Sequence, residues 1–201
     1  MAGTPRRTYK KSAVTRQTIL EAALELMKEK GYRGTTIREI CTRAGTAVGS
    51  FYSYFDGKTD ILRALYADGE TYFSTVVRQE TAGADTEEAL RVFVSHYARL
   101  NIRTGVETVR VMYTPDNEWF ARRKSQQEVL EEVVRRGQES GRITRRLEAA
   151  RVVDDIFLCL RGVCYDWCSR NGAYDLEARM LECLELLLPG LRPGPEEEDT
   201  D

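Results

Sequence analysis

The most consistent signal along the chain is the recurrence of apolar residues three and four positions apart, which is the spacing of an amphipathic helix. Residues 12–30 show it clearly, and Gly31 follows at a position where a helix commonly ends. The apolar positions of this segment are Ile19, Ala22, Ala23 and Leu26. No alternation of the kind that marks a β-strand persists, so the pattern predicts an all-α protein.

Glycine and proline residues divide the remaining chain into further helices. A short helix begins near Thr36, because Thr36 and Glu39 fit a capping box, and Thr35 is the alternative cap. Gly45 ends this helix, and Asp56 is placed to cap a longer one. The predicted helices after Gly45 cover about 47–54, 57–79, 86–103, 106–113, 117–140, 148–170 and 175–188, which makes about nine in all.

Composition narrows the class of protein. The chain has 201 residues, of which 42% are apolar and 31% charged, with 30 basic against 32 acidic residues, as in ordinary globular proteins. No apolar run reaches the roughly 20 residues of a membrane helix, and the N-terminus does not resemble a secretory signal. We therefore expect a cytoplasmic protein whose five cysteines are reduced and which has no membrane partner.

Candidate catalytic and metal sites are scarce. His96 is the one histidine, which excludes a multi-histidine metal site, and the chain has no GxGxxG, GxxxxGK[ST], HExxH or GxSxG motif. Cys159, Cys164 and Cys168 share one predicted helix. A thiol or metal switch is conceivable there, but without a nearby histidine or carboxylate cluster we favour cysteines that pack as small apolar residues. The sequence predicts no enzyme, no metal and no cofactor.

Residues 35–55 carry the strongest functional motif. Two short helices joined by a glycine turn predict a helix-turn-helix, whose second helix enters the major groove of DNA. The groove-facing positions are small or polar, so the backbone can approach base edges; they are Thr46, Ala47, Gly49, Ser50 and Ser53. The first 60 residues hold 11 basic and 6 acidic side chains, an excess that suits a polyanion. The alternative is an ordinary helical hairpin with solvated charges.

Residues 16–66 resemble the DNA-binding domain of the TetR family of transcriptional regulators. The matching text is RQTILEAALELMKEKGYRGTTIREICTRAGTAVGSFYSYFDGKTDILRALY. The landmarks are Gly31-Tyr32, Thr35-Thr36, Ile40, Ala44-Gly45, Gly49-Ser50-Phe51-Tyr52, Tyr54-Phe55 and Lys58. The resemblance covers about a quarter of the chain, and the remaining helices fit the size of the all-α ligand domain of this family.

The resemblance implies roles at the matching positions. Phosphate contacts are expected from Thr35, Thr36, Tyr54 and Lys58. Base edges or the adjacent backbone are expected to be met by Val48, Gly49, Ser50 and Tyr52, with Thr46 and Ala47 beside them. Cys41 departs from the usual small alanine, and Ala47 from a hydroxyl that commonly caps the recognition helix, a role that Thr46 could take over. Arg38 and Arg43 are further candidate contacts, or solvated charges.

The resemblance also implies a role in dimerisation for the last two long helices of the chain. Two long helices, over about 150–188, would pair with their copies in a homodimer that reads a palindromic operator. Their apolar stripes are Ile156, Phe157, Leu160, Val163, Cys164 and Trp167, and Leu176, Met180, Leu184, Leu187 and Leu188. The alternative is that these stripes pack in the core of the same protomer.

The middle helices would enclose a small-molecule effector. The candidate lining residues, each of which is also compatible with an ordinary core, are Phe93, His96, Tyr97, Tyr113, Trp119, Phe120 and Tyr165. His96 is either a core histidine or a polar anchor for the ligand. An acidic head group could be received by Arg103, Arg110, Arg122 and Arg123, although a solvated face explains these arginines equally well.

These inferences give a fold class and a function. The fold is all-α, with an N-terminal three-helix helix-turn-helix domain followed by a larger helical ligand-binding and dimerisation domain. Its parts are a basic disordered arm at 1–11, the DNA-binding domain at 12–56, a connecting helix at 57–79, the ligand domain at 80–189 and an acidic disordered tail at 190–201. The expected function is a repressor that a lipophilic or aromatic effector releases from a double-stranded operator. A transcriptional activator and a ligand-independent DNA-binding protein are the alternatives.

Overall fold

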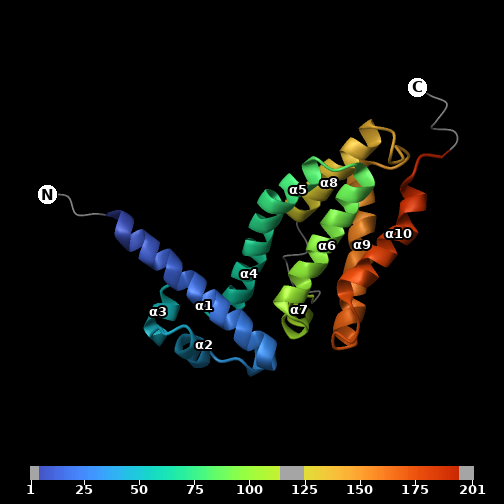
Figure 1. Ribbon diagram of the computed structural model, residues 1–201. Coiled ribbons are helices and arrows are strands. Elements are labelled where there is room, and N and C mark those ends of the chain that lie inside the picture. The colour runs from blue at the N-terminus through green and yellow to red at the C-terminus, as the bar shows by residue number, and fades with distance from the viewer. Residues whose placement is uncertain (1–4, 114–124, 195–201) are drawn as a thin grey trace.

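The computed structural model describes residues 5–113 and 125–194 of the chain. The described residues form helices and loops without a strand. Residues 58–82 make one continuous helical rod, and with this rod counted once the described residues form nine helices. Figure 1 shows a small lower-left domain joined by this rod to a larger helical domain. The all-α class predicted from the hydrophobic pattern and the two-part fold implied by the family resemblance are therefore confirmed.

The small domain consists of three helices. Helix α1 covers Pro5–Gly34, and its geometry breaks at Gly31, whose φ of 77° lies in the left-handed region that glycine tolerates. Helix α2 covers Ile37–Arg43 and helix α3 covers Val48–Tyr52. The break at Gly31 is where the sequence predicts the end of the first helix. The helix starts at Pro5, however, within the stretch 1–11 predicted as a disordered arm, and proline suits a first turn because its missing N–H is not needed there.

The rod that joins the domains contains three segments. Helix α4 covers Lys58–Tyr72, a π-helical turn η1 covers Phe73–Val77 and helix α5 covers Arg78–Ala82. The rod begins at Gly57 as N-cap, without a side-chain hydrogen bond, so the expectation that Asp56 caps it is wrong. The π turn adds a residue to one helical turn, a distortion that is frequent at functional sites.

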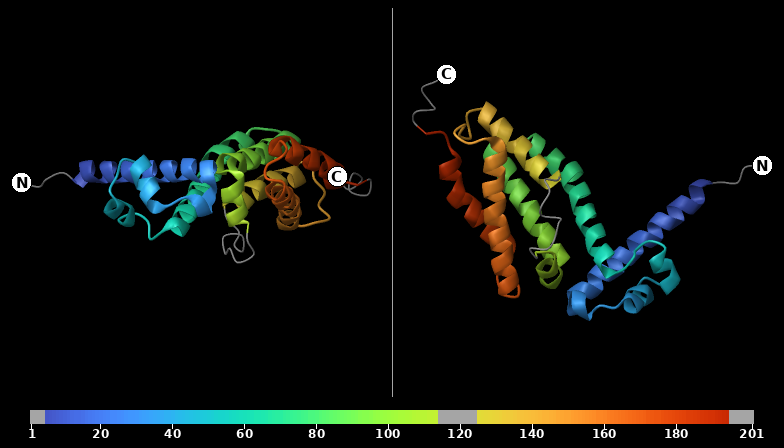
Figure 2. Two further views of the ribbon diagram at one scale, coloured as in Figure 1. Left: turned by 90° about the horizontal axis from the view of Figure 1, so that it is seen from below. Right: turned by 180° about the vertical axis from the view of Figure 1, so that it is seen from behind.

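The large domain packs five helices around the rod. They are α6 (Thr86–Thr104), α7 (Val106–Met112), α8 (Ser125–Glu139), α9 (Ala149–Ser169) and α10 (Leu176–Leu191). Asp85 and Asp175 cap α6 and α10, because their carboxylates accept from the N–H of Glu88 and Ala178, each at 3.1 Å. Both views of Figure 2 place α9 and α10 side by side, at the end of the molecule remote from α2 and α3. The first part of the helix predicted over 117–140 lies outside the described residues.

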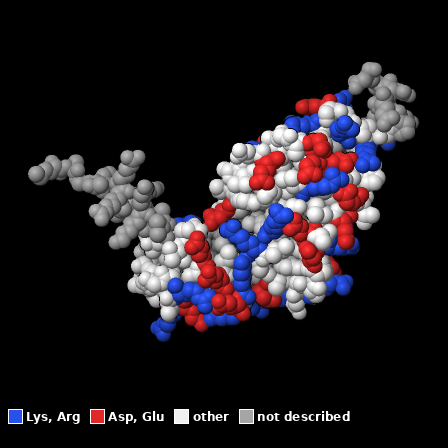
Figure 3. Space-filling view, viewed as in Figure 1, with Lys and Arg blue, Asp and Glu red and all other residues white. Residues whose placement is uncertain are grey.

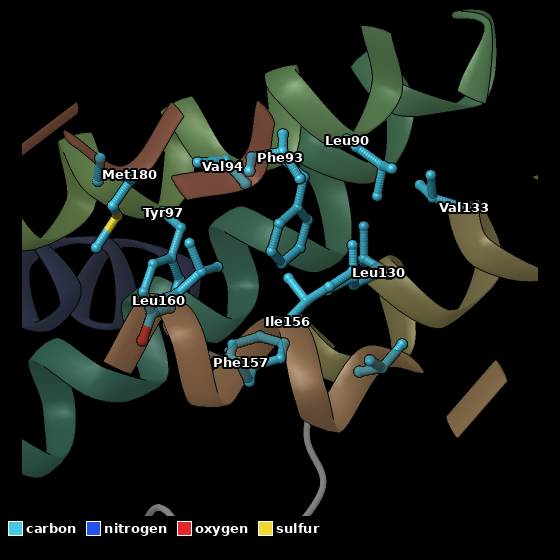
Figure 4. Close-up of a cluster of buried hydrophobic side chains, with 14 of the residues drawn as sticks. Leu90, Phe93, Val94, Tyr97, Leu130, Val133, Ile156, Phe157, Leu160 and Met180 are labelled. Atoms are coloured by element: carbon cyan, nitrogen blue, oxygen red, sulfur yellow. The ribbon is translucent and has the colours of Figure 1, made fainter. Parts of the chain in front are cut away.

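Each domain has its own hydrophobic core. The core of the small domain is formed by buried side chains, of which the following are at most 1% exposed: Ile19, Leu20, Ala23, Met27, Ile40, Phe51 and Ile61. In the large domain the aromatic rings of Phe73, Phe93 and Phe157 meet edge to face, with centroids 5.2 Å and 6.0 Å apart. Figure 4 shows this second cluster between α6, α8 and α9. Since Ile61 and Phe73 both belong to the rod, one helix is fixed in both cores.

The apolar stripes predicted to pair between protomers lie mainly inside the protomer. Ile156, Phe157, Leu160, Cys164 and Trp167 of α9 are buried, as are Leu176, Met180, Leu184 and Leu188 of α10. Val163 and Leu187 are half-buried. Most residues of these stripes therefore pack in the core of the same protomer, which is the alternative interpretation given above. They do so because α9 covers α8 and α10 covers α6 within one protomer.

The contact between α8 and the start of α6 gives a stability prediction. A Cβ atom on Gly137 would lie 2.6 Å from Thr86 Cγ2 and 2.8 Å from Ile143 Cδ1. We expect Gly137→Ala to lower the free energy of unfolding by about 1–3 kcal/mol, because the buried neighbours must move. Gly190→Ala is the control, since nothing lies within 4 Å of a Cβ atom there. Equal denaturation midpoints for the two variants would contradict this packing.

Candidate nucleic-acid interface and effector cavity

The turn between α2 and α3 depends on one glycine. Gly45 has a φ of +63°, and the N–H of Thr46 donates to the carbonyl of Cys41 at 3.0 Å. Helix α3 is then held by Phe51, which is fully buried and whose ring lies 5.5 Å from that of Phe55. This anchor leaves the opposite face of α3 without cover from its own protomer.

The uncovered face of α3 presents short side chains and two apolar ones. Val48 is 41% exposed and Tyr52 is 55% exposed, and they lie one turn apart on the same face. Ala47, Gly49 and Ser53 are also exposed, whereas Thr46, Ser50 and Tyr54 are half-buried. A face of this kind can approach the base edges of a major groove and meet thymine methyl groups. The structure thus brings most of the predicted base-facing residues together.

The capping box predicted at the start of α2 is confirmed. The Thr36 N–H donates to Glu39 Oε2 at 2.9 Å, and the Glu39 N–H donates to Thr36 Oγ1 at 3.3 Å. Hydrogen bonds from the Lys30 ammonium and from Thr36 hold the pKa of Glu39 at about 2, so its carboxylate stays ionised. The Thr36 hydroxyl therefore has a structural partner in Glu39, and its contact with a phosphate stays a prediction.

Two predicted phosphate contacts have internal roles. Thr35 is only 1% exposed, and its hydroxyl donates to the Gly31 carbonyl at 2.8 Å, so the expectation that this side chain reaches a phosphate is wrong. The Lys58 ammonium donates to the carbonyls of Tyr32 and Thr35, each at 2.8 Å, and lies 4.6 Å from the centre of the Tyr32 ring. It thereby binds carbonyls at the end of α1 and in the link to α2. An ammonium has three donors, so one remains for an anion.

The two candidate arginines of α2 differ. Arg43 makes a two-pronged ion pair with Glu29 of α1, at 2.5 Å and 2.9 Å, so it fastens α2 to α1. Arg38 is exposed and has no ion pair within the described part of the chain. Of these two residues, Arg38 is the one whose guanidinium can be directed at a phosphate without loss of an existing contact.

A cavity lies inside the large domain, between the rod and helices α6, α7 and α8. Its volume is about 40 Å³, with room for roughly three waters. Its walls are formed by Leu65, Tyr66, Gly69, Tyr97, Leu100, Asn101, Thr104, Met112, Tyr113 and Gln126. The lining is mostly apolar and aromatic, with a few amide and hydroxyl groups, as is usual for sites that bind small organic molecules.

The predicted ligand-lining residues divide into three groups. Tyr97 and Tyr113 line the cavity, and their hydroxyls are 2.6 Å apart; burial raises the pKa of Tyr97 above its ordinary value. Phe93 packs in the core and does not line the cavity. Tyr165 is 68% exposed, because the residue after the buried Cys164 points to another side of the helix, so its assignment to the cavity is wrong. Trp119 and Phe120, with Arg122 and Arg123, lie outside the described residues.

His96 connects the two ends of the π turn. Its Nδ1 lies 2.5 Å from the Tyr72 hydroxyl and its Nε2 lies 2.7 Å from Glu80 Oε2. The neutral tautomer with its proton on Nε2 satisfies both contacts, since it accepts from Tyr72 and donates to Glu80. His96 does not line the cavity, and its role as a polar anchor for a ligand stays a prediction; its ring joins α6 to the rod on both sides of η1.

Arg110, Cys164 and Cys168 have contacts within the fold. The Arg110 guanidinium donates to the Asn171 side chain at 2.5 Å and to the Cys168 carbonyl, which joins α7 to the end of α9. Burial raises the pKa of Cys164 to about 12 and that of Cys168 to about 11, so both thiols stay protonated. Within the described residues, no three His, Cys, Asp or Glu side chains are placed to hold a metal ion.

The outward face of α9 and α10 carries three large apolar side chains among charged ones. Leu158 and Tyr165 of α9 are 66% and 68% exposed, and Leu186 of α10 is 77% exposed. Sequence reasoning missed Leu158 and Leu186, because both stand beside broader apolar stripes that fill the core. Exposed apolar side chains of this size, gathered on one pair of helices, are typical of an interface with another protein surface. None of the described helices has the length and apolar character needed to cross a bilayer.

Two glycines of the helix-turn-helix differ in backbone conformation and should respond differently to substitution by alanine. A Cβ atom added at either position would have no neighbour within 4 Å, but only Gly45 has a positive φ. We expect Gly45→Ala to cost about 1–2 kcal/mol of unfolding free energy, since an L-residue is strained there. Gly49→Ala should raise the free energy of unfolding by about 0.5–1 kcal/mol, because alanine favours the helix. Thermal denaturation measures both, and a loss for Gly49→Ala as large as that for Gly45→Ala would contradict the turn geometry.

Comparison with known proteins places both domains in one family. Residues 19–65 match bacterial regulatory proteins of the tetR family, and residues 71–190 match the C-terminal region of YsiA-like protein. The chain is 26% identical over 181 residues to a fatty acid metabolism regulator protein of Bacillus subtilis, covering 86% of this chain and 93% of the relative. It is 22% identical over 186 residues to a probable acrEF/envCD operon repressor of Escherichia coli K12, covering 85% and 84%.

A solved structure shares the whole arrangement. The transcriptional regulator FadR from Bacillus subtilis, in complex with stearoyl-CoA, superposes with a TM-score of 0.73 and 25% identity, covering 88% of this chain and 99% of that one. The family match over 71–190 extends over more than half of the chain, and the match over 19–65 contains the exposed helix α3 and its glycine turn. The chain therefore belongs to the TetR family of bacterial transcriptional regulators, with an N-terminal helix-turn-helix and a helical ligand-binding domain.

Proposed function

We propose that the protein is a cytoplasmic repressor that binds a palindromic DNA operator as a homodimer and leaves it when a lipophilic effector enters the large domain. The observation that carries this proposal is the uncovered face of α3, mounted on a rod that also forms a wall of the effector cavity. Catalysis is not part of the proposal, because the relatives are transcriptional regulators. Activation of transcription by the same DNA contact is the alternative outcome.

The contacts proposed for DNA follow from exposure. Val48 and Tyr52 face base edges, and the polypeptide at Ala47 and Gly49 approaches the groove closely because no long side chain intervenes. Arg38 and the free donor of Lys58 meet phosphates on either side, which supplies affinity without sequence choice. Few of these side chains form bidentate pairs with bases, so the shape of the operator contributes to recognition.

The dimer is proposed to form through the outward face of α9 and α10. Leu158, Tyr165 and Leu186 are the apolar residues that a second copy would cover, and both helices lie far from α3 (Figure 1). A two-fold axis at this end leaves the two copies of α3 free to meet successive major grooves. The buried stripes of the same helices give the interface a rigid support.

The effector is proposed to carry an alkyl chain. The cavity lining is largely apolar, and one relative was solved with stearoyl-CoA while another is named for fatty acid metabolism. A volume of about 40 Å³ is far too small for a long acyl chain, so binding must separate the rod from α6 and α7. A ligand that requires this separation favours a different conformation, which is the differential affinity that release from DNA needs.

The DNA contact is tested by substitution on α3. An operator is first enriched from random-sequence duplexes with the purified wild-type protein. We expect Val48→Ala and Tyr52→Ala each to weaken binding at least about 10-fold, since a lost base contact costs about 1–3 kcal/mol. Thermal stability should change little, because both side chains are exposed. Gln79→Ala, an exposed change on α5, is the control. Failure to enrich any duplex, or unchanged affinity in both variants, would contradict the proposed interface.

The effector class is tested on the wild-type protein. We expect palmitoyl-CoA to lower operator affinity at least about 10-fold in fluorescence anisotropy, with coenzyme A alone without effect, because the alkyl chain supplies the binding energy by leaving water. A complex with operator that withstands palmitoyl-CoA, palmitate and 1-decanol at saturation would contradict an alkyl effector.

A further inference from the structure

A groove runs along the junction of the two domains, beside the effector cavity. Its volume is about 260 Å³, and it is bounded by one helix of the small domain, the rod and α6. The lining residues are Leu24 of α1, Leu65, Asp68, Gly69 and Tyr72 of α4, and Arg99, Leu100, Arg103 and Thr104 of α6. In the space-filling view of Figure 3, basic side chains gather on the face between the two domains.

The groove has a net positive lining. Arg99 and Arg103 face one carboxylate, that of Asp68. Arg103 is exposed and has no ion pair among the residues that the structure describes, whereas Arg99 pairs with Glu177 at 2.7 Å at the outer edge. Burial and Glu80 raise the pKa of Tyr72, while Arg99 and Arg103 act in the opposite direction, so both guanidinium groups lie within electrostatic reach of this hydroxyl. An anion placed beside Tyr72 would meet the Tyr72 hydroxyl and the two guanidinium groups, with Asp68 in the same lining and Glu80 also within electrostatic reach.

The basic groove and the apolar cavity share a wall. Leu65, Gly69, Leu100 and Thr104 line both spaces. Gly69 contributes no side chain between them, and a Cβ atom there would approach Leu100 Cδ2 to 3.1 Å. Leu65 and Leu100 therefore lie between a basic surface groove and an apolar interior.

We propose that this groove binds the anionic head group of the effector, while the alkyl tail occupies the enlarged cavity. The inference rests on the alkyl effector of the proposed function and adds the site of its charged end. The ligand chemistry is a long alkyl chain that ends in an anion, either the carboxylate of a free fatty acid or the phosphates of an acyl thioester of coenzyme A. Arg103 and Arg99 pair with the anion, and the Tyr72 hydroxyl donates to it.

The position of the groove explains how the head group would affect DNA binding. Leu24 belongs to α1, whose neighbouring residues Ala23 and Leu26 are buried in the core of the small domain. A head group in the groove is thus held between the DNA-binding domain and α6. Donation from Tyr72 to the anion would also replace its contact with His96, which fixes the rod on both sides of the π turn. In this proposal the anion changes contacts at the junction of the two domains, and the alkyl tail enlarges the cavity.

The experiment measures ligand affinity by isothermal titration calorimetry with three probes: palmitoyl-CoA, palmitate and uncharged 1-decanol. We expect Arg103→Ala and Arg99→Ala each to weaken binding of palmitoyl-CoA or palmitate at least about 10-fold, with Arg103→Lys close to wild type. Binding of 1-decanol and the operator affinity of the ligand-free variants should stay unchanged. Arg135→Ala is the matched control, because Arg135 is an exposed arginine on α8 away from the groove.

The outcomes separate the inference from the proposed function. If the wild-type protein binds an anionic alkyl probe and both arginine variants bind it equally well, the groove assignment is overturned and the alkyl effector stands. An equal loss of 1-decanol binding in Arg103→Ala would show a structural role for the arginine and also overturn the assignment. If the wild-type protein binds its operator but none of the three probes, the effector class and the groove assignment both fail. Arginine dependence for palmitoyl-CoA alone, or for palmitate as well, supports the groove and identifies the phosphate or carboxylate source.

Discussion

The structure depends on the fixation of one helical rod in two hydrophobic cores. Ile61 and Leu62 are buried with α1 and α3 in the small domain, and Phe73 and Val77 are buried with α6 and α8 in the large one. Because packed cores resist gradual deformation, a change in the packing of one end of the rod must move the other end as a unit. The π turn and the contacts of His96 with Tyr72 and Glu80 lie where the rod enters the large domain. They therefore hold the rod in its orientation relative to α6.

The DNA-binding half can be predicted closely from sequence because its signals are local. A capping box requires two residues at fixed spacing, and Thr36 with Glu39 supplies them. The turn requires a positive φ, which points directly to Gly45. The apolar spacing of α1 identifies its buried face through Ile19 and Ala23. What a local pattern does not show is which hydroxyls the fold itself uses, and for this reason the sequence assigns Thr35 to DNA although its hydroxyl bonds to Gly31.

The large domain is harder to predict because contacts between residues far apart in the sequence decide which side chains are buried and which line the cavity. Periodicity marks a helix face as apolar, but it does not show which of two adjacent apolar residues faces the core. Cys164 faces the core, whereas Tyr165 is exposed. In the same way it does not separate a histidine that bridges two helices from one that lines a cavity. The lining of that cavity comes from the rod, α6, α7 and α8 at once, so residues such as Gly69 and Asn101 carry no local signal of their role.

We propose that effector binding moves the two copies of α3 in the dimer relative to one another. A nitroxide carried by an unnatural amino acid at position 42, an exposed site on α2, reports this distance in the dimer by pulsed electron spin resonance. We expect palmitoyl-CoA to shift the distance distribution by several ångströms from the one seen on operator DNA. An unchanged distribution in a sample that palmitoyl-CoA has released from the operator would contradict it.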